Sequence, residues 1–156
     1  MRTILSSLLA AIILSGCATK SRESRNAKSV EENKMEAVTG IGGVFFKARD
    51  PKMMAAWYRD HLGINSKGGH ADFTWREKDH PDETGRTVWS LFPAKSGYFP
   101  GPIMINYRVA NLDKMLKQLQ SAGVKVEKTE DYDYGRFAWL TDPEGNRIEL
   151  WEPKKK

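Results

Sequence analysis

VFFKARDPKMMAAWYRDHLG, residues 44–63, predicts a β-strand that leads directly into an amphipathic helix. The strand is the apolar run 44–48. Asp50 and Pro51 are suited to the N-cap and the first position of a helix, and Gly63 is suited to its end. Between these limits, large side chains recur at helical spacing, which predicts that they form the buried stripe. The stripe comprises Met54, Trp57, Tyr58, His61 and Leu62.

The same pattern returns about 60 residues later. Residues 103–109 form a second apolar run, Asn111 stands at the cap position and Gly123 at the end of the helix. Asp50 and Asn111 are 61 positions apart, and Gly63 and Gly123 are 60 apart. One offset shared by different landmarks indicates an internal repeat.

Strand-like segments follow each predicted helix. After the first they are residues 72–76 and 87–92, and after the second residues 124–126, 137–140 and 147–151. Asp142 to Gly145 has the Pro and Gly placement of a type I turn. The chain therefore predicts an α+β fold in which a strand, a helix and two or three strands occur twice. Two such units side by side would leave a concave sheet surface between them.

The charge of the chain is concentrated at its ends. Of 156 residues, 25 are Lys or Arg and 20 are Asp or Glu, but residues 37–153 hold 16 of each. A nucleic-acid-binding protein needs its positive charge on a folded face, so we expect no nucleic-acid partner. The single Cys excludes an internal disulfide.

The N-terminus has the layout of an export signal. Arg2 precedes an apolar stretch, residues 4–14, which as a helix would span about 16 Å, too short to cross a membrane. Leu14-Ser15-Gly16-Cys17 resembles the lipobox of bacterial lipoproteins. This resemblance implies a signal peptide over residues 1–16 and acylation of Cys17, with Ala18 favouring the periplasmic side of the outer membrane. Residues 17–37 are expected to form a flexible tether, and residues 154–156 a basic tail.

Both ends of the repeat carry a family pattern. Residues 41–64 resemble the opening of a glyoxalase/bleomycin resistance/dioxygenase domain, the vicinal oxygen chelate superfamily, and Asp142-Pro143-Glu144-Gly145 through Pro153 resembles its last hairpin. The resemblance covers residues 38–153. It implies paired βαβββ modules that form a curved mixed sheet around a cavity, and a homodimer as the default assembly.

Enzymes of this family hold one divalent metal ion in that cavity. The resemblance places the metal positions on Gly43, Ser90, Met104 and Glu149. Among these, Glu149 alone carries an ordinary metal ligand, because glycine has no side chain, a thioether is soft and a hydroxyl is a weak neutral donor. We therefore predict no cofactor. Glu149 is the one candidate catalytic or metal-binding residue, and the alternative is a single divalent ion held with non-standard ligands.

Strand alternation predicts which side chains face the concave surface. The expected ligand-binding residues share that face and combine aromatic, cationic and polar groups. Arg147 is expected to pair with Glu149 and keep it ionised. Residues 130–134 form either a solvated turn or an acidic, aromatic lip that attracts cationic ligands. The ligand-binding set is Phe45, Lys47, Ser90, Met104, Asn106, Arg108, Arg147 and Trp151.

These features favour an envelope-anchored protein that binds a small, partly planar organic ligand. Its partners would be that ligand and the lipid bilayer. The alternative is a metal-dependent lyase or ring-cleaving dioxygenase of the glyoxalase type that uses Glu149.

Overall fold

The computed structural model describes residues 35–78 and 81–154. The expected signal peptide, most of the tether and Cys17 therefore lie outside the described residues. No helix within the described ranges is long and apolar enough to cross a membrane. The elements are β1 (Val38–Ala48), α2 (Pro51–Leu62), β2 (His70–Arg76), β3 (Thr84–Pro93), β4 (Ile103–Val109), α3 (Leu112–Ser121), β5 (Val126–Tyr132), β6 (Gly135–Thr141) and β7 (Arg147–Pro153).

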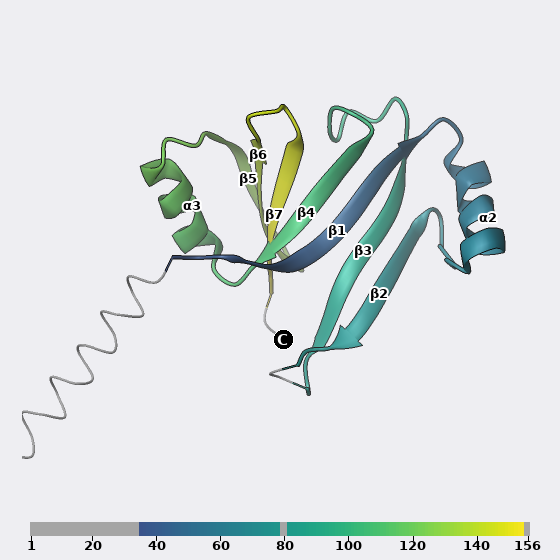
Figure 1. Ribbon diagram of the computed structural model, residues 1–156, viewed down its shortest axis with the longest axis horizontal. Coiled ribbons are helices and arrows are strands. Elements are labelled where there is room, and N and C mark those ends of the chain that lie inside the picture. Colours follow the sequence, from purple (N-terminus) through teal and green to yellow (C-terminus); the bar gives the residue numbers. More distant parts are fainter. Residues whose placement is uncertain (1–34, 79–80, 155–156) are drawn as a thin grey trace, which may run out of the picture. The chain divides into compact units, whose positions relative to one another are not determined.

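The strands form one mixed, curved sheet in the order β2-β3-β1-β4-β7-β6-β5 (Figure 1). In each half the first strand lies parallel to the last: β1 pairs with β3, and β4 with β7. The halves join where β1 and β4 run antiparallel. This arrangement confirms the predicted α+β fold. Within the described residues, two strands follow α2 and three follow α3.

Both helices begin where the sequence predicts. The Asp50 side chain accepts a hydrogen bond from the Met53 N–H at 2.9 Å, and Pro51 occupies the first turn of α2. The Asn111 side chain accepts one from the Lys114 N–H at 2.9 Å. Each bond satisfies a donor that the helix itself leaves unpaired, which stabilises a helix by about 1 kcal/mol. Gly63 ends α2 at φ 68°, in the left-handed region.

Helix α2 packs on β1 and β3 with fewer side chains than expected. Met54, Ala55 and Tyr58 contact a cluster built on Trp89 and Leu91. The prediction that Trp57 belongs to the core is wrong, because 48% of its surface is exposed. Positions 54, 55 and 58 share the face that meets the sheet, and Trp57 lies on the outer side, against Tyr58 and His61.

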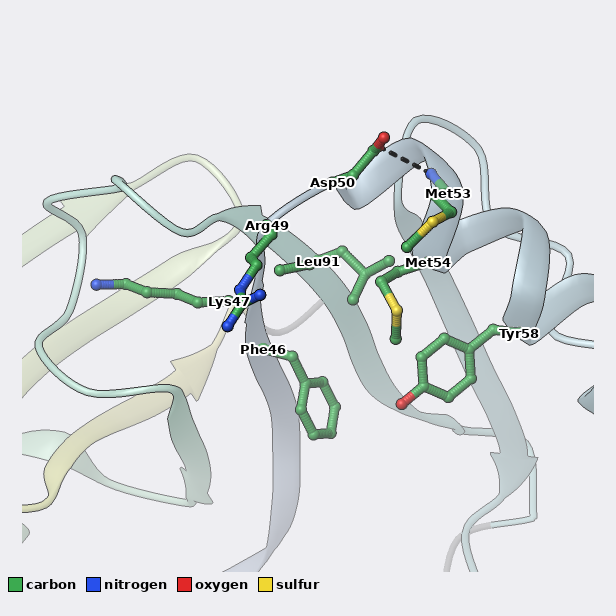
Figure 2. Close-up of a pocket in the computed structure, with 9 residues that line it drawn as sticks. Phe46, Lys47, Arg49, Asp50, Met53, Met54, Tyr58 and Leu91 are labelled. Atoms are coloured by element: carbon green, nitrogen blue, oxygen red, sulfur yellow. Dashed lines mark hydrogen bonds between the residues drawn. The ribbon is translucent and has the colours of Figure 1, made fainter.

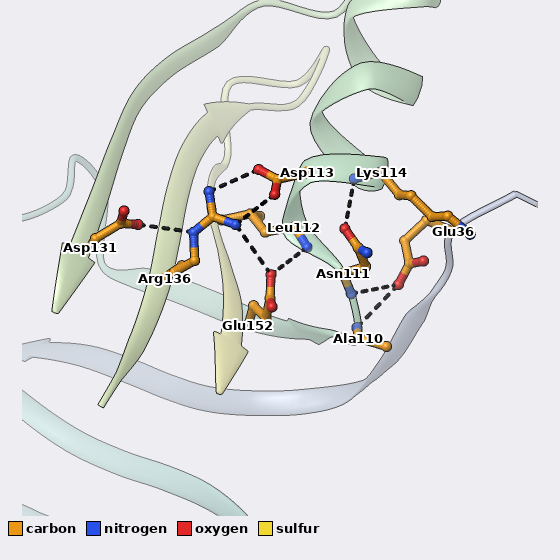
Figure 3. A network of polar contacts seen from close by, with 9 residues as sticks. All are labelled: Glu36, Ala110, Asn111, Leu112, Asp113, Lys114, Asp131, Arg136 and Glu152. Carbon is orange, nitrogen blue, oxygen red and sulfur yellow. Dashed lines mark hydrogen bonds and ion pairs between the residues drawn. The ribbon is translucent and has the colours of Figure 1, made fainter. Parts of the chain in front are cut away.

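A polar network fixes the start of α3 (Figure 3). Glu152 accepts a hydrogen bond from the Leu112 N–H at 2.7 Å, and Arg136 pairs with Asp113 at 2.8 Å. Glu36 accepts from the N–H groups of Ala110 and Asn111 at 3.1 and 3.0 Å. The last residues of the expected tether are therefore bound to the domain.

Side chains alternate between the two faces of the sheet as predicted. Phe46 packs beneath α2, and Val109 and Leu150 pack beneath α3. Side chains that alternate with these outer ones along the strands, together with Phe99 of the loop between β3 and β4, form a separate cluster on the opposite face of the sheet. We call this face the inner face. This inner cluster contains Phe45, Val88, Phe92, Phe99, Met104, Phe137, Trp139 and Trp151.

Residues 130–134 are not a simple turn. Strand β5 continues to Tyr132, well past the predicted strand at 124–126, and the chain turns back into β6 at Gly135. The rings of Tyr132 and Tyr134 stack with centroids 5.4 Å apart, and each makes an edge contact with Phe137 at 5.6 Å. The segment thereby extends the aromatic surface of the inner face.

Candidate functional site

Glu149 lies at the centre of the inner face. It sits on β7 in register with Asn106 of β4, and only 2% of its surface is exposed. The Tyr98 hydroxyl donates to its two carboxylate oxygens at 3.1 and 3.3 Å. The side chains of Asn106 and Trp139 also hydrogen-bond with it. This buried carboxyl group is well satisfied by three neutral partners, but among the residues that the structure describes no cation neutralises it.

Burial therefore controls the charge of Glu149. Desolvation raises its pKa from 4.5 to about 6, although the hydrogen bonds from Asn106, Tyr98 and Trp139 act in the opposite direction. Desolvation, followed by the nearby carboxylate, raises the pKa of Tyr98 well above its usual value. The phenol thus remains a proton donor at neutral pH.

The predicted pairing of Arg147 with Glu149 is wrong. Arg147 pairs with Glu127 of β5, which also accepts a hydrogen bond from Thr141. Arg147 begins β7 opposite Thr141 of β6, and Glu127 comes from β5, on the far side of β6. Strand alternation indicates which face a residue occupies, but the partner is set by how the strands assemble.

The loop between β3 and β4 covers Glu149 with aromatic rings. Tyr98 stacks on Phe92 with centroids 5.4 Å apart, and Phe99 is 1% exposed within the inner cluster. Sequence reasoning missed both loop residues, together with Phe137 and Trp139 as members of the site. The available signal was an aromatic pair among Gly97, Pro100 and Gly101, because a solvated loop gains nothing from large apolar side chains.

Lys47 belongs to the inner face, as predicted. Its ammonium nitrogen lies 5.1 Å from the centre of the Phe99 ring, and no carboxylate of a described residue pairs with it. Figure 2 shows this side chain pointing away from a cavity of about 320 Å³ between α2 and the outer face of the sheet. That cavity, lined by residues such as Met53, Met54 and Tyr58, is on the side of the sheet opposite Glu149.

Arg108 is held away from Glu149. It pairs with Glu77 at 3.1 Å, donates to the Thr39 hydroxyl at 3.2 Å, and lies 5.5 Å from the centre of the Trp75 ring. These contacts tie the end of β4 to β1 and to the segment after β2. The guanidinium group of Arg108 is therefore occupied by contacts within the protein.

The four family metal positions do not fit a divalent ion. An added Cβ at Gly43 would lie 2.8 Å from the Phe45 ring, so a phenyl group fills that place. Met104 is 1% exposed among aromatic rings, and the Ser90 hydroxyl lies 2.8 Å from His70 Nδ1. Glu149 is the remaining donor, and one carboxylate does not complete a coordination shell. No group of three or more His, Cys, Asp or Glu side chains in the described ranges could hold a metal ion.

The inner face carries two buried polar atoms without partners. Among described residues, Asn106 Oδ1 and Trp151 Nε1 make no hydrogen bond. Gly42 lets Asn106 approach closely, since a Cβ there would lie 2.1 Å from Oδ1 and 2.8 Å from the Trp151 ring. Trp151 stacks on Phe137 with centroids 6.2 Å apart. Unpaired buried acceptors and donors of this kind suit a site that meets polar groups of a ligand.

Three tyrosines leave part of the aromatic surface open. Tyr98, Tyr132 and Tyr134 are 45%, 44% and 63% exposed. They stand over the buried rings of Phe137 and Trp139. The arrangement is an aromatic stacking surface beside a buried carboxyl group.

Together, the sheet order and the inner face define a two-unit α+β domain with its site at the junction of the halves. A family model described as Glyoxalase/Bleomycin resistance protein/Dioxygenase superfamily matches residues 40–150. The chain belongs to this superfamily, as the sequence pattern predicted. No curated protein sequence matches the chain.

Solved structures share this fold. Methylmalonyl-CoA epimerase from Mycobacterium tuberculosis is 24% identical with a TM-score of 0.50, over 78% of this chain and 93% of that one. A variant of Streptomyces coelicolor methylmalonyl-CoA epimerase, in complex with 2-nitronate-propionyl-CoA, is 17% identical with a TM-score of 0.55. That match covers 76% of this chain and all of the epimerase. At these sequence identities, the comparison shows a shared fold alone.

Proposed function

We propose that this chain is an envelope-anchored member of the superfamily that binds a small organic ligand on its inner face without the family's divalent metal. The observation that carries the proposal is the environment of Glu149. Its carboxyl group is enclosed by a phenol, an amide and an indole, and the other three metal positions lack suitable ligands. Recognition there would rest on stacking and hydrogen bonding.

The surrounding residues suit a planar ligand with an anionic group. The exposed faces of Tyr98, Tyr132 and Tyr134 offer stacking surfaces. Lys47, which no described carboxylate neutralises, offers a charge partner on the same face. Arg108 and Arg147, which the sequence also suggested, are paired with Glu77 and Glu127. We therefore assign the charged contact to Lys47.

2-Naphthoate is a suitable probe because it combines a planar ring with a carboxylate. Calorimetric titration of the purified chain is expected to give saturable binding that Lys47→Gln weakens about tenfold, the effect of losing about 1.4 kcal/mol. Lys95→Gln, an exposed lysine in the loop beside Tyr98, is the matched control and should bind like the parent protein. Equal affinities for all three proteins would contradict the assignment.

Metal content tests the other half of the proposal. Elemental analysis of the protein purified without added metal is expected to give much less than one divalent ion per chain. One ion per chain in the parent protein, lost in Glu149→Ala, would instead favour the metal-dependent lyase or dioxygenase. Glu144→Ala, in an exposed turn, is the control for the loss of a carboxylate.

Location and assembly complete the proposal. Acylation of Cys17 would hold the domain at the outer membrane, facing the periplasm, and three acyl chains would anchor it firmly. A homodimer is the expected assembly. Both expectations rest on the family and lipobox resemblances.

A further inference from the structure

We infer that Ser90, His70 and Asp72 form a second site on the inner face, in which Ser90 acts as an acyl-accepting nucleophile toward esters with a good leaving group. His70 Nδ1 lies 2.8 Å from Ser90 Oγ, and His70 Nε2 lies 3.5 Å from Asp72 Oδ1. The hydroxyl of Ser90 is thus close to a base, His70, and that base is close to a carboxylate, Asp72, that can orient it.

The pairing of β2 with β3 places these three side chains next to one another. His70 of β2 is in register with Ser90 of β3, and residues opposite each other in an antiparallel pair share a face. Asp72 follows His70 by two positions along β2, which returns it to that same face. Arg86 Nε donates to Asp72 Oδ1 at 2.8 Å and fixes the carboxylate. The three groups are therefore held on paired strands rather than on mobile loops.

One tautomer satisfies every contact. With its proton on Nε2, which lies 3.5 Å from Asp72 Oδ1, His70 leaves Nδ1 as the acceptor for the Ser90 hydroxyl. Serine-dependent acyl transfer requires this arrangement of a base that accepts the hydroxyl proton while a carboxylate stabilises the resulting imidazolium.

The site is reachable from solvent and is distinct from Glu149. The His70 side chain is 48% exposed and that of Asp72 37%, while Ser90 is 8% exposed beneath them. Strands β1 and β4 separate β3 from β7, which carries Glu149.

The acyl transfer step balances as follows. The Ser90 hydroxyl proton moves to His70 Nδ1 while Oγ forms a bond to the ester carbonyl carbon. The bond from that carbon to the leaving oxygen breaks, and the departing alcohol or phenol takes the proton from His70. Water, activated by the same imidazole, then hydrolyses the acyl-serine and restores the hydroxyl.

The test uses p-nitrophenyl acetate and the full chain. Intact-mass analysis is expected to show one added acetyl group, and peptide mapping should place it on Ser90. Ser90→Ala should lose the adduct, whereas Ser121→Ala, an exposed serine at the end of α3, should keep it. His70→Gln should slow acylation at least about a hundredfold, and His61→Gln, an exposed histidine of α2, should not. An adduct on another residue, or a rate of p-nitrophenol release no higher than that of Ser90→Ala at every pH between 6 and 9, would overturn the proposal.

Asp72 is a positioning residue, and its role has a separate readout. Asp72→Asn should lower kcat for acylation by p-nitrophenyl acetate without changing KM, and Asp72→Glu, which keeps the carboxylate, should restore part of the rate. A merely structural role would give no such rescue. Binding of 2-naphthoate should persist in Ser90→Ala, so failure of this inference and failure of the proposed ligand site can be told apart.

Discussion

At the scale of single residues, Glu149 matters because its ionisation is coupled to folding. Its pKa is about 6 in the folded protein against 4.5 for an exposed glutamate, because burial disfavours the charged form. Between these two values the folded chain holds more protons than the unfolded chain. The contribution of Glu149 to stability is therefore present below about pH 4.5 and is lost as the pH rises through about 6.

Glu149→Gln should remove this dependence. We expect the parent protein to lose about 2 kcal/mol of unfolding free energy relative to the glutamine variant as the pH rises from 4 to 7. Urea unfolding at intervals of one pH unit measures the difference. The comparison cancels the carboxylates whose pKa values are lowered by their partners, such as Asp113 beside Arg136. Parallel curves for the two proteins would contradict the raised pKa.

Gly42 provides a second residue-scale prediction. A Cβ at this position would lie 2.1 Å from Asn106 Oδ1 and 2.8 Å from the Trp151 ring, both held in a packed sheet. Gly42→Ala should therefore cost about 1–3 kcal/mol of unfolding free energy. Gly97→Ala, where no atom lies within 4 Å of the added carbon, should change it by about 0.5 kcal/mol or less. Chemical denaturation of both variants decides the matter, and equal stabilities would be inconsistent with this packing.

Residue faces could be predicted from the sequence, but residue partners could not. Strand alternation placed Phe45, Met104 and Trp151 together because the pleat has a fixed period of two. The partner of Arg147 depends on Glu127, which is 20 positions away in sequence and becomes a neighbour only once β5, β6 and β7 assemble. Tyr98 escaped prediction for the same reason, since its contact with Glu149 spans 51 positions.

At the scale of elements, local signals determined where helices begin and end. Asp50, Asn111 and Gly63 act within one turn of the chain, so their roles follow from sequence alone. The face of α2 that packs on the sheet could not be predicted as well. Its hydrophobic side chains occupy more than one face, and contact with β1 and β3 selects Met54 and Tyr58 rather than Trp57.

The cap of α3 can be tested directly. Asn111→Ala should cost about 1 kcal/mol of unfolding free energy because the Lys114 N–H loses its acceptor. Asn111→Ser should retain most of the stability, since a hydroxyl can accept the same bond. Asn65→Ala, at an exposed loop position after α2, serves as the control. The cap would have no energetic role if the alanine and serine variants unfolded at the same urea concentration.

At the scale of the whole molecule, the internal repeat predicted the architecture, because two similar strand–helix units are expected to pair side by side. The shared offset of the two strand–helix units led to the α+β sheet that the structure shows, with β1 and β4 at the junction. One member of the inner cluster was not predictable from that symmetry. Phe99 comes from the loop between β3 and β4, which has no counterpart in the repeat.

The proposed location of the molecule depends on one residue outside the described domain, Cys17. Residues 4–14 are too short to span a bilayer, so stable attachment would depend on acyl chains joined to this one thiol. Cys17→Ser should therefore move the protein from the membrane to the soluble fraction of fractionated cells. The soluble variant should retain 2-naphthoate binding, because the proposed ligand contacts lie within residues 35–154. Ser15→Ala, which leaves the thiol in place, should remain with the membrane, and unchanged fractionation of Cys17→Ser would exclude the lipid anchor.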